Sequence, residues 1–255
     1  MEAKNARRGI QSIEIAFRLL TALQSRPTAL SLKEVAGLAG MTTSAANNYL
    51  VSLVRTGLAA ADTKAGHYKL GPAALGLGMS AIQQIDGFEL LRREVIDLRD
   101  ETKRSTAVTA WTADGPISLF KQDGELRGAF EMRTGLVPLL GTAAGKVFAA
   151  CLPLSETRHL IEQETRDEPV DAAELQREIR NELSRKKYAT LRRDDSYGYV
   201  SMAAPVWNWN GDIRFAISIV GNRNTLQTDR KSVYVQALLQ SAARATASLG
   251  GKAGI

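Results

Sequence analysis

The chain has little of what disulfides, metal clusters and membrane spans require. Cys151 is its only cysteine, and His67 and His159 are its only histidines, which excludes an internal disulfide and a zinc site built from a cysteine cluster. No run of about 18 apolar residues occurs, so no membrane-spanning helix is predicted. The basic start of the chain lacks the apolar segment of a secretory signal. We therefore expect a cytoplasmic protein without membrane contact and without a cofactor or metal ion.

What the sequence does contain is an excess of positive charge, and this excess is unevenly distributed. The 255 residues have a net charge of +6, of which +5 belongs to residues 1–71 and only +1 to residues 72–255. A basic N-terminal third favours attraction to nucleic-acid phosphates. A charge that served solubility alone would not need to be segregated.

Residues 31–55 predict two helices joined by a tight turn. Ser31 followed by Glu34 is typical of a capping box, and Gly40 suits the left-handed conformation that ends many helices. Thr42 is the predicted N-cap of the second helix. The apolar stripe predicted for that helix consists of Ala46, Leu50, Leu53 and Val54.

The opposite face of this second helix contains hydrogen-bonding side chains, and such a helix fits the major groove of DNA. A merely solvated polar face is the alternative, so this segment alone leaves DNA binding open. The predicted DNA contacts, with Lys64 from the hairpin that follows, are Ser31, Thr42, Thr43, Ser44, Asn47, Asn48, Ser52, Arg55 and Lys64.

The flanking segments complete a winged helix-turn-helix domain over residues 1–71. Strands are predicted over residues 58–62 and 67–70, with Lys64 at the tip of their hairpin. Residues 72–87 are predicted to be a linker helix. A first amphipathic helix over residues 10–25 has a predicted buried stripe of Ile13, Ala16, Phe17, Leu20 and Leu23.

Residues 88–255 predict a second domain of mixed α/β class. A helix is expected over residues 88–102, and a hairpin over residues 106–122 turns at Gly115. Further strands are expected over residues 126–132, 188–192, 200–207 and 213–220, and further helices over residues 139–152, 155–164, 171–187 and 229–249.

Five segments in this order resemble the IclR family of bacterial transcription regulators. They are SIEIAFRLLTAL, LSLKEVAGLAGMTTSAANNYLVSLVRTGLA, HYKLGPAALGLG, VPLLGTAAGKVFAACLP and YVSMAAPVWNWNGDIRFAISIVG. The resemblance implies a winged helix-turn-helix domain followed by a GAF-like effector-binding domain with an antiparallel sheet and flanking helices. It also implies an operator in double-stranded DNA, a small effector, and a homodimer or homotetramer.

The recognition helix departs from the family pattern. The family commonly has Lys, His and Arg where this chain has Thr43, Asn47 and Asn48. Asparagine can pair with two atoms of adenine. We therefore expect this helix to contribute little to the salt dependence of binding and to prefer adenine in the operator.

Residues 141–146 precede a predicted buried helix and resemble the family loop that holds an effector carboxylate. Free amides at a helix N-terminus favour an anion, although small residues there can also serve packing alone. The spacing does not match a phosphate-binding P-loop. Ser201 and Ser218 match family positions that face the pocket. The predicted effector contacts are Leu126, Val137, Thr142, Ala143, Ala144, Asp194, Ser201, Ser218 and Val220.

We expect the effector to be a small organic acid, aromatic acids included, whose binding changes operator affinity. An enzyme that uses Cys151 with His159 is the first alternative, but a thiol in an apolar helix is usually inert. An architectural DNA-binding protein without a ligand is the second alternative, and the large α/β domain argues against it. We therefore predict that the chain is not an enzyme.

Overall fold

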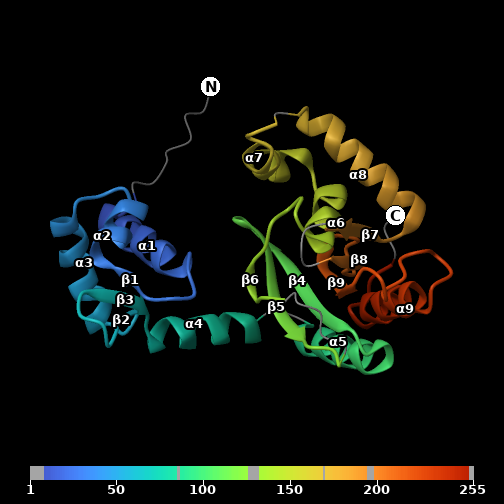
Figure 1. The fold of residues 1–255 in the computed structure, drawn as a ribbon, viewed down its shortest axis with the longest axis horizontal. Coiled ribbons are helices and arrows are strands. Elements are labelled where there is room, and N and C mark those ends of the chain that lie inside the picture. Colours follow the sequence, from blue (N-terminus) through green and yellow to red (C-terminus); the bar gives the residue numbers. More distant parts are fainter. Residues whose placement is uncertain (1–8, 85–86, 126–131, 169, 194–197, 253–255) are drawn as a thin grey trace. The chain divides into compact units, whose positions relative to one another are not determined.

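The structure, a computed structural model, describes residues 9–84, 87–125, 132–168, 170–193 and 198–252. The chain divides into two compact units, one ending at Asp86 and one beginning at Gly87 (Figure 1). None of the described helices is long and apolar enough to cross a membrane.

The first unit consists of three packed helices, a small antiparallel sheet and a fourth helix. Strand β3 lies between β1 and β2 in the sheet. Helices α1, α2 and α3 enclose an apolar core that includes Leu19, Val35 and Leu50, which is the expected winged helix-turn-helix arrangement. The elements are α1 (Gln11–Gln24), β1 (Leu30–Ser31), α2 (Leu32–Leu38), α3 (Thr43–Arg55), β2 (Ala59–Ala61), β3 (His67–Leu70) and α4 (Pro72–Gln83).

Local signals in the sequence set the helix ends as predicted. Ser31 and Glu34 make both hydrogen bonds of a capping box at the start of α2. Gly40 has a φ of +66° after the end of that helix, and glycine adopts this conformation without a steric penalty. The side chain of Thr42 accepts a hydrogen bond from the amide of Ala45 and so caps α3.

Helix α1 buries only part of the predicted stripe, since Leu23 is buried and Ala16 and Leu20 pack against the core. Leu19, Ala22 and Leu23 are buried, whereas Ile13 and Phe17 are each 64% exposed. The assignment of Ile13 and Phe17 to the core is therefore wrong, because the buried face also includes Leu19 and Ala22 and leaves the edge of the predicted stripe exposed. The prediction that Val54 of α3 belongs to the buried stripe is also wrong, because Val54 is exposed while Leu50 and Leu53 are buried.

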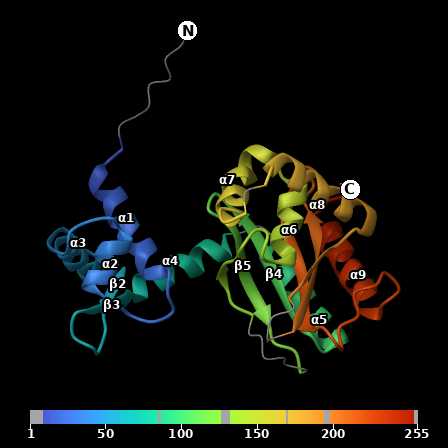
Figure 2. The same cartoon turned by 45° about the horizontal axis from the view of Figure 1, so that its top comes forward.

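The second unit is built on a six-stranded antiparallel sheet in the order β6-β5-β4-β9-β8-β7. Helices α5 and α9 pack together on one face, and α6 packs on the other face beneath α8 (Figures 1 and 2). The elements are α5 (Phe88–Thr102), β4 (Ser105–Thr112), β5 (Gly115–Gln122), β6 (Gly135–Leu136), α6 (Ala143–Cys151), α7 (Leu154–Glu164), α8 (Ala172–Lys186), β7 (Ala189–Arg192), β8 (Tyr199–Trp207), β9 (Ile213–Asn222) and α9 (Val233–Ser248).

The helix predicted over residues 139–152 is shorter than expected. Helix α6 begins at Ala143, with Thr142 as its N-cap. The amides of Leu139 and Leu140 instead donate hydrogen bonds to Glu164, over 2.6 and 2.8 Å. These distant bonds hold residues 139–142 outside the helix, and the sequence pattern around Leu139 gives no sign of them.

Candidate DNA-binding surface and effector cavity

The polar side chains predicted to contact DNA share the outer face of α3. Ala46, Leu50 and Leu53 point into the core of the first unit, so residues at the intervening positions face solvent. The exposed residues of this face are Thr43, Ser44, Asn47, Asn48, Ser52 and Arg55, with Thr42 exposed at its start. The helix thus presents donors and acceptors of the kinds that read base edges.

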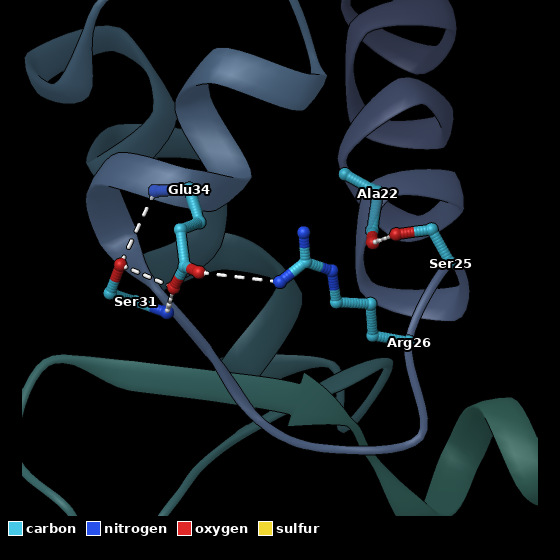
Figure 3. Close-up of polar contacts among 5 residues, drawn as sticks. All are labelled: Ala22, Ser25, Arg26, Ser31 and Glu34. Atoms are coloured by element: carbon cyan, nitrogen blue, oxygen red, sulfur yellow. Dashed lines mark hydrogen bonds and ion pairs between the residues drawn. The ribbon is translucent and has the colours of Figure 1, made fainter.

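Ser31, one of the predicted DNA contacts, is the N-cap of α2. Its Oγ lies 2.7 Å from Glu34 Oε2 and its amide donates to the same oxygen over 2.9 Å (Figure 3). Arg26 Nη1 lies 3.6 Å from the other carboxylate oxygen. The hydrogen bonds from Ser31 are the main cause that lowers the pKa of Glu34. The Ser31 side chain therefore caps α2.

The turn between β2 and β3 forms the tip of the wing. Lys64 is exposed at this tip, while Lys69 is paired across the hairpin with Asp62 over 2.9 Å. His67 Nδ1 lies 3.1 Å from the carbonyl oxygen of Ala65. Lys64 is thus the basic residue that the hairpin offers to a phosphate.

In the second unit, a cavity with about 520 Å³ of empty space, part of it open to solvent, lies between the sheet and the start of α6. Its floor consists of five short side chains from the adjacent strands β5, β4, β9 and β8, namely Ala107, Thr109, Ser118, Ser201 and Ser218. The cavity remains unfilled because these side chains are small. The described lining residues are Ala107, Thr109, Ser118, Met132, Arg133, Val137, Gly141, Thr142, Ala143, Ala144, Tyr199, Ser201, Ser218 and Val220.

The start of α6 presents two free amides to this cavity. Thr142 Oγ1 accepts a hydrogen bond from the amide of Gly145 over 2.9 Å and donates to the carbonyl oxygen of Pro138 over 2.8 Å. Within the described residues, the amides of Ala143 and Ala144 have no acceptor. Free amides at a helix N-terminus, together with the helix dipole, attract an anion.

Side chains from α8 hold the other end of α6. Gln176 Nε2 donates to the carbonyl oxygens of Ala149 and Leu152, over 2.8 and 3.1 Å. Arg180 Nε donates to the carbonyl oxygen of Ala150 over 2.7 Å. These bonds satisfy carbonyl groups that a helix C-terminus leaves free, so α6 is fixed at both ends.

The cavity brings together seven of the nine residues predicted to bind the effector, namely Val137, Thr142, Ala143, Ala144, Ser201, Ser218 and Val220. The other two, Leu126 and Asp194, lie outside the described residues. The sequence analysis missed Thr109, Ser118, Arg133 and Tyr199. The alternation of side chains along β4 and β5 would have placed Thr109 and Ser118 on the same face as Ser218, but Arg133 follows no such pattern.

Cys151 and His159, the two residues considered for catalysis, do not form a nucleophile and base pair. Burial raises the pKa of the Cys151 thiol to about 12, which removes the thiolate that a nucleophile needs. His159 is exposed on α7, whereas Cys151 lies in α6. In the described part of the chain, no group of three or more His, Cys, Asp or Glu side chains is placed to hold a metal ion.

Two family models match the chain. The IclR helix-turn-helix domain matches residues 12–63, and the model described as bacterial transcriptional regulator IclR C-terminal matches residues 79–247. The chain is 26% identical to the HTH-type transcriptional regulator XynR of Escherichia coli over 216 residues, which cover 82% of this chain and 85% of XynR. It is 34% identical to the HTH-type transcriptional regulator TtgV of Pseudomonas putida over 148 residues, which cover 57% of this chain and 56% of TtgV.

Solved structures share the whole fold. The crystal structure of an IclR transcriptional regulator from Alicyclobacillus acidocaldarius has a TM-score of 0.77 and 24% identity, with 96% of this chain and 100% of that chain covered. An IclR homologue from Microbacterium hydrocarbonoxydans, crystallised in complex with 4-hydroxybenzoate, has a TM-score of 0.72 and 15% identity, with 93% and 98% covered. The chain belongs to the IclR family of bacterial transcriptional regulators, with a DNA-binding N-terminal domain and an effector-binding C-terminal domain.

Proposed function

We propose that the outer face of α3 binds an operator sequence, and that a small organic acid bound beneath α6 changes the affinity for that operator. The observation on which this proposal mainly rests is the cavity at the start of α6, with its two free amides at Ala143 and Ala144. An effector shifts the protein between two conformations only if it binds one of them better than the other.

The surface of α3 supports the DNA-binding part of the proposal. Asn47 and Asn48 are exposed in the middle of the helix, where side chains reach base edges when a recognition helix lies in the major groove. Arg55 and Lys64 are exposed and basic, so we assign them to phosphates rather than to bases. The proposed operator therefore contains adenine opposite at least one of the two asparagines.

The charge of the cavity supports an acid as the effector. Arg133 is exposed at its rim, and none of the described lining residues is acidic. An anion would meet the positive end of the α6 dipole and this guanidinium, while a cation would meet no opposite charge there. The Microbacterium relative was crystallised with 4-hydroxybenzoate, an aromatic monocarboxylate. We therefore assign the carboxylate of the effector to the amides of Ala143 and Ala144.

Exposed apolar helices in the first unit support a homodimer. No residue of α4 is buried, and its Leu75 and Leu77 are 68% and 64% exposed. Ile13 and Phe17 of α1 are exposed to a similar extent. Apolar surface of this kind on a soluble protein marks an interaction site, and we propose a second copy of the chain as the partner. Such a dimer would bind two half-sites of a palindromic operator.

The experiment that tests the DNA-binding part uses DNA fragments that the purified protein selects from a random pool. Asn47→Ala and Asn48→Ala are compared with Gln24→Ala, which changes an exposed amide at the end of α1. Loss of one asparagine–adenine pair should cost about 1–3 kcal/mol, or roughly 5- to 150-fold in Kd. Gln24→Ala should leave the Kd unchanged. Unchanged affinity in both asparagine variants would contradict the assignment of α3.

A further inference from the structure

An exposed valine lies in the middle of the polar outer face of α3. Val51 is 43% exposed, although valine favours burial and is a weaker helix former than alanine. Its neighbours on the helix surface, three and four positions away, include Asn47, Asn48 and Arg55, which are all exposed. Val51 therefore shares the surface that we assign to the operator, and packing within the first unit does not account for it.

The pitch of the helix places Val51 between the two asparagines. Each residue of an α-helix turns the side-chain direction by about 100°, so Val51 lies about 40° from Asn47 on one side and about 60° from Asn48 on the other. The buried Ala46 lies about 140° away. Val51 thus faces outward on the same side as the two proposed base-reading residues.

The other exposed valine of α3 occupies a different position. Val54 is 37% exposed and lies one turn after the buried Leu50, about 40° from it around the helix. It therefore covers the border of the apolar core, and its partial exposure follows from that place. Val51 does not cover the core, because the residues one turn before and after it, Asn47 and Arg55, are both exposed.

The major groove offers one kind of apolar partner to such a side chain. Base edges there present hydrogen-bond donors and acceptors, and the exception is the C5-methyl group of thymine. A valine that enters the groove loses contact with water, which is favourable where it meets a methyl group, because apolar surface is then buried on both sides. Against cytosine, the same valine would cover the N4 amino group and leave a donor without an acceptor.

We infer that Val51 contacts the methyl group of a thymine in the operator, within about two base pairs of the adenine that pairs with Asn47 or Asn48. This inference rests on the proposed role of the outer face of α3. Side chains four positions apart on a helix are about 6 Å apart, and successive base pairs are about 3.4 Å apart. The separation of Val51 from Asn47 therefore corresponds to less than two base-pair steps.

The test removes the methyl group from the DNA and shortens the valine in the protein. The full-length protein selects duplexes from a random pool, and each thymine of a selected duplex is replaced in turn by deoxyuridine, which lacks only the C5-methyl group. Replacement at one position of a half-site should weaken wild-type binding about fourfold, the effect of burying one methyl group.

The variant Val51→Ala should remove this sensitivity. Alanine suits an exposed helix position, so the fold is retained. The variant should bind the unmodified duplex more weakly than the wild type does. Its Kd values for the unmodified and the deoxyuridine duplex should agree within about twofold, because the methyl group then has no apolar partner.

Val54→Ala is the matched control, because it shortens a partly exposed valine of the same helix that borders the core. This variant should keep the penalty of about fourfold for deoxyuridine. The adenine is located with 7-deazaadenine, which lacks N7 and should weaken binding by the wild type but not by Asn47→Ala or Asn48→Ala. The sensitive thymine should lie no more than about two base pairs from that adenine.

Binding that ignores the methyl group would overturn the inference. The contradicting results are an unchanged wild-type Kd with deoxyuridine at every position, a penalty that persists in Val51→Ala, and a sensitive thymine further from the adenine. A loss of affinity in Val51→Ala that is independent of the methyl group would overturn it as well. If no duplex is selected, or if Asn47→Ala and Asn48→Ala bind every duplex like the wild type, the proposed function of α3 itself fails, and the inference fails with it.

Discussion

Glu164 Oε1 accepts a 2.6 Å hydrogen bond from the amide of Leu139 and so ties the end of α7 to the segment that leads into α6. The second oxygen accepts from the amide of Leu140 over 2.8 Å. One carboxylate thus satisfies two backbone donors in a segment that has no regular secondary structure. Because this segment precedes the free amides of Ala143 and Ala144, Glu164 sets the position of one end of the effector cavity.

Glu164→Gln should destabilise the second unit. Hydrogen bonds to a charged acceptor contribute about 1.5–3 kcal/mol each, and the glutamine amide would place donors opposite the donor of Leu139 or Leu140. We expect the free energy of unfolding to fall by about 1–3 kcal/mol, measured by urea denaturation. Glu162→Gln is the control, since Glu162 pairs with Arg158 over 3.4 Å at an exposed site, and exposed pairs contribute at most about 1 kcal/mol. Equal losses in both variants would contradict the role of Glu164.

The capping box at Ser31 and Glu34 predicts a dependence of α2 on pH. The hydrogen bonds from Ser31 hold the pKa of Glu34 below its ordinary value of 4.5. The carboxylate therefore stabilises α2 above that value, and this contribution is lost as the pH falls through the lower pKa of the folded state. Hydrogen exchange of the peptide that covers α2 should accelerate between pH 5 and pH 3, relative to the intrinsic rate, by more in the wild type than in Glu34→Gln. The same acceleration in both proteins would show that the capping box does not contribute.

Cys151 should react slowly while the protein is folded. Its pKa is raised to about 12 by burial in α6, so at pH 8 it should react with a thiol reagent roughly a thousandfold more slowly than an exposed cysteine. Unfolding in guanidinium should restore the ordinary rate. Cys151→Ala should leave operator affinity unchanged, since the thiol lines neither the cavity nor the face of α3. Rapid labelling of the native protein would contradict this description of the thiol.

The proposed homodimer predicts the effect of charges on the exposed apolar helices. Phe17→Glu in α1 and Leu75→Glu in α4 should lower the mass found by sedimentation and weaken operator binding, because a buried charge opposes the contact between copies. Val233→Glu, which alters a residue 72% exposed on α9, should change neither property. A wild-type chain that sediments as a monomer at operator-binding concentrations would rule out the dimer.

The sequence predicted the elements whose signals are local. Capping at Ser31 and Thr42 and the conformation of Gly40 depend on a few neighbouring residues, and all three expectations are confirmed. The predicted buried stripe of α1 is right for Leu23 and wrong for Ile13 and Phe17, because periodicity alone does not decide which apolar positions the core covers. Phe17 is exposed for this reason.

The missed parts of the candidate site depend on contacts between distant residues. The predicted helix over residues 139–152 was too long because Glu164, far along the chain, binds Leu139 and Leu140. Ser118 was missed because its place in the cavity lining depends on the order of the strands in the sheet as well as on the alternation along β5. The free amides of Ala143 and Ala144, by contrast, follow from a helix start that the sequence places within a few residues.

The most direct measurement is operator affinity with and without an acid that raises the melting temperature of the intact protein. The two domains must be coupled for the effector to act, and coupling energies of this kind correspond to about 5- to 150-fold in affinity. We predict that saturating acid changes the operator Kd by at least about fivefold, in either direction. An operator Kd that stays the same at saturating acid would contradict the account.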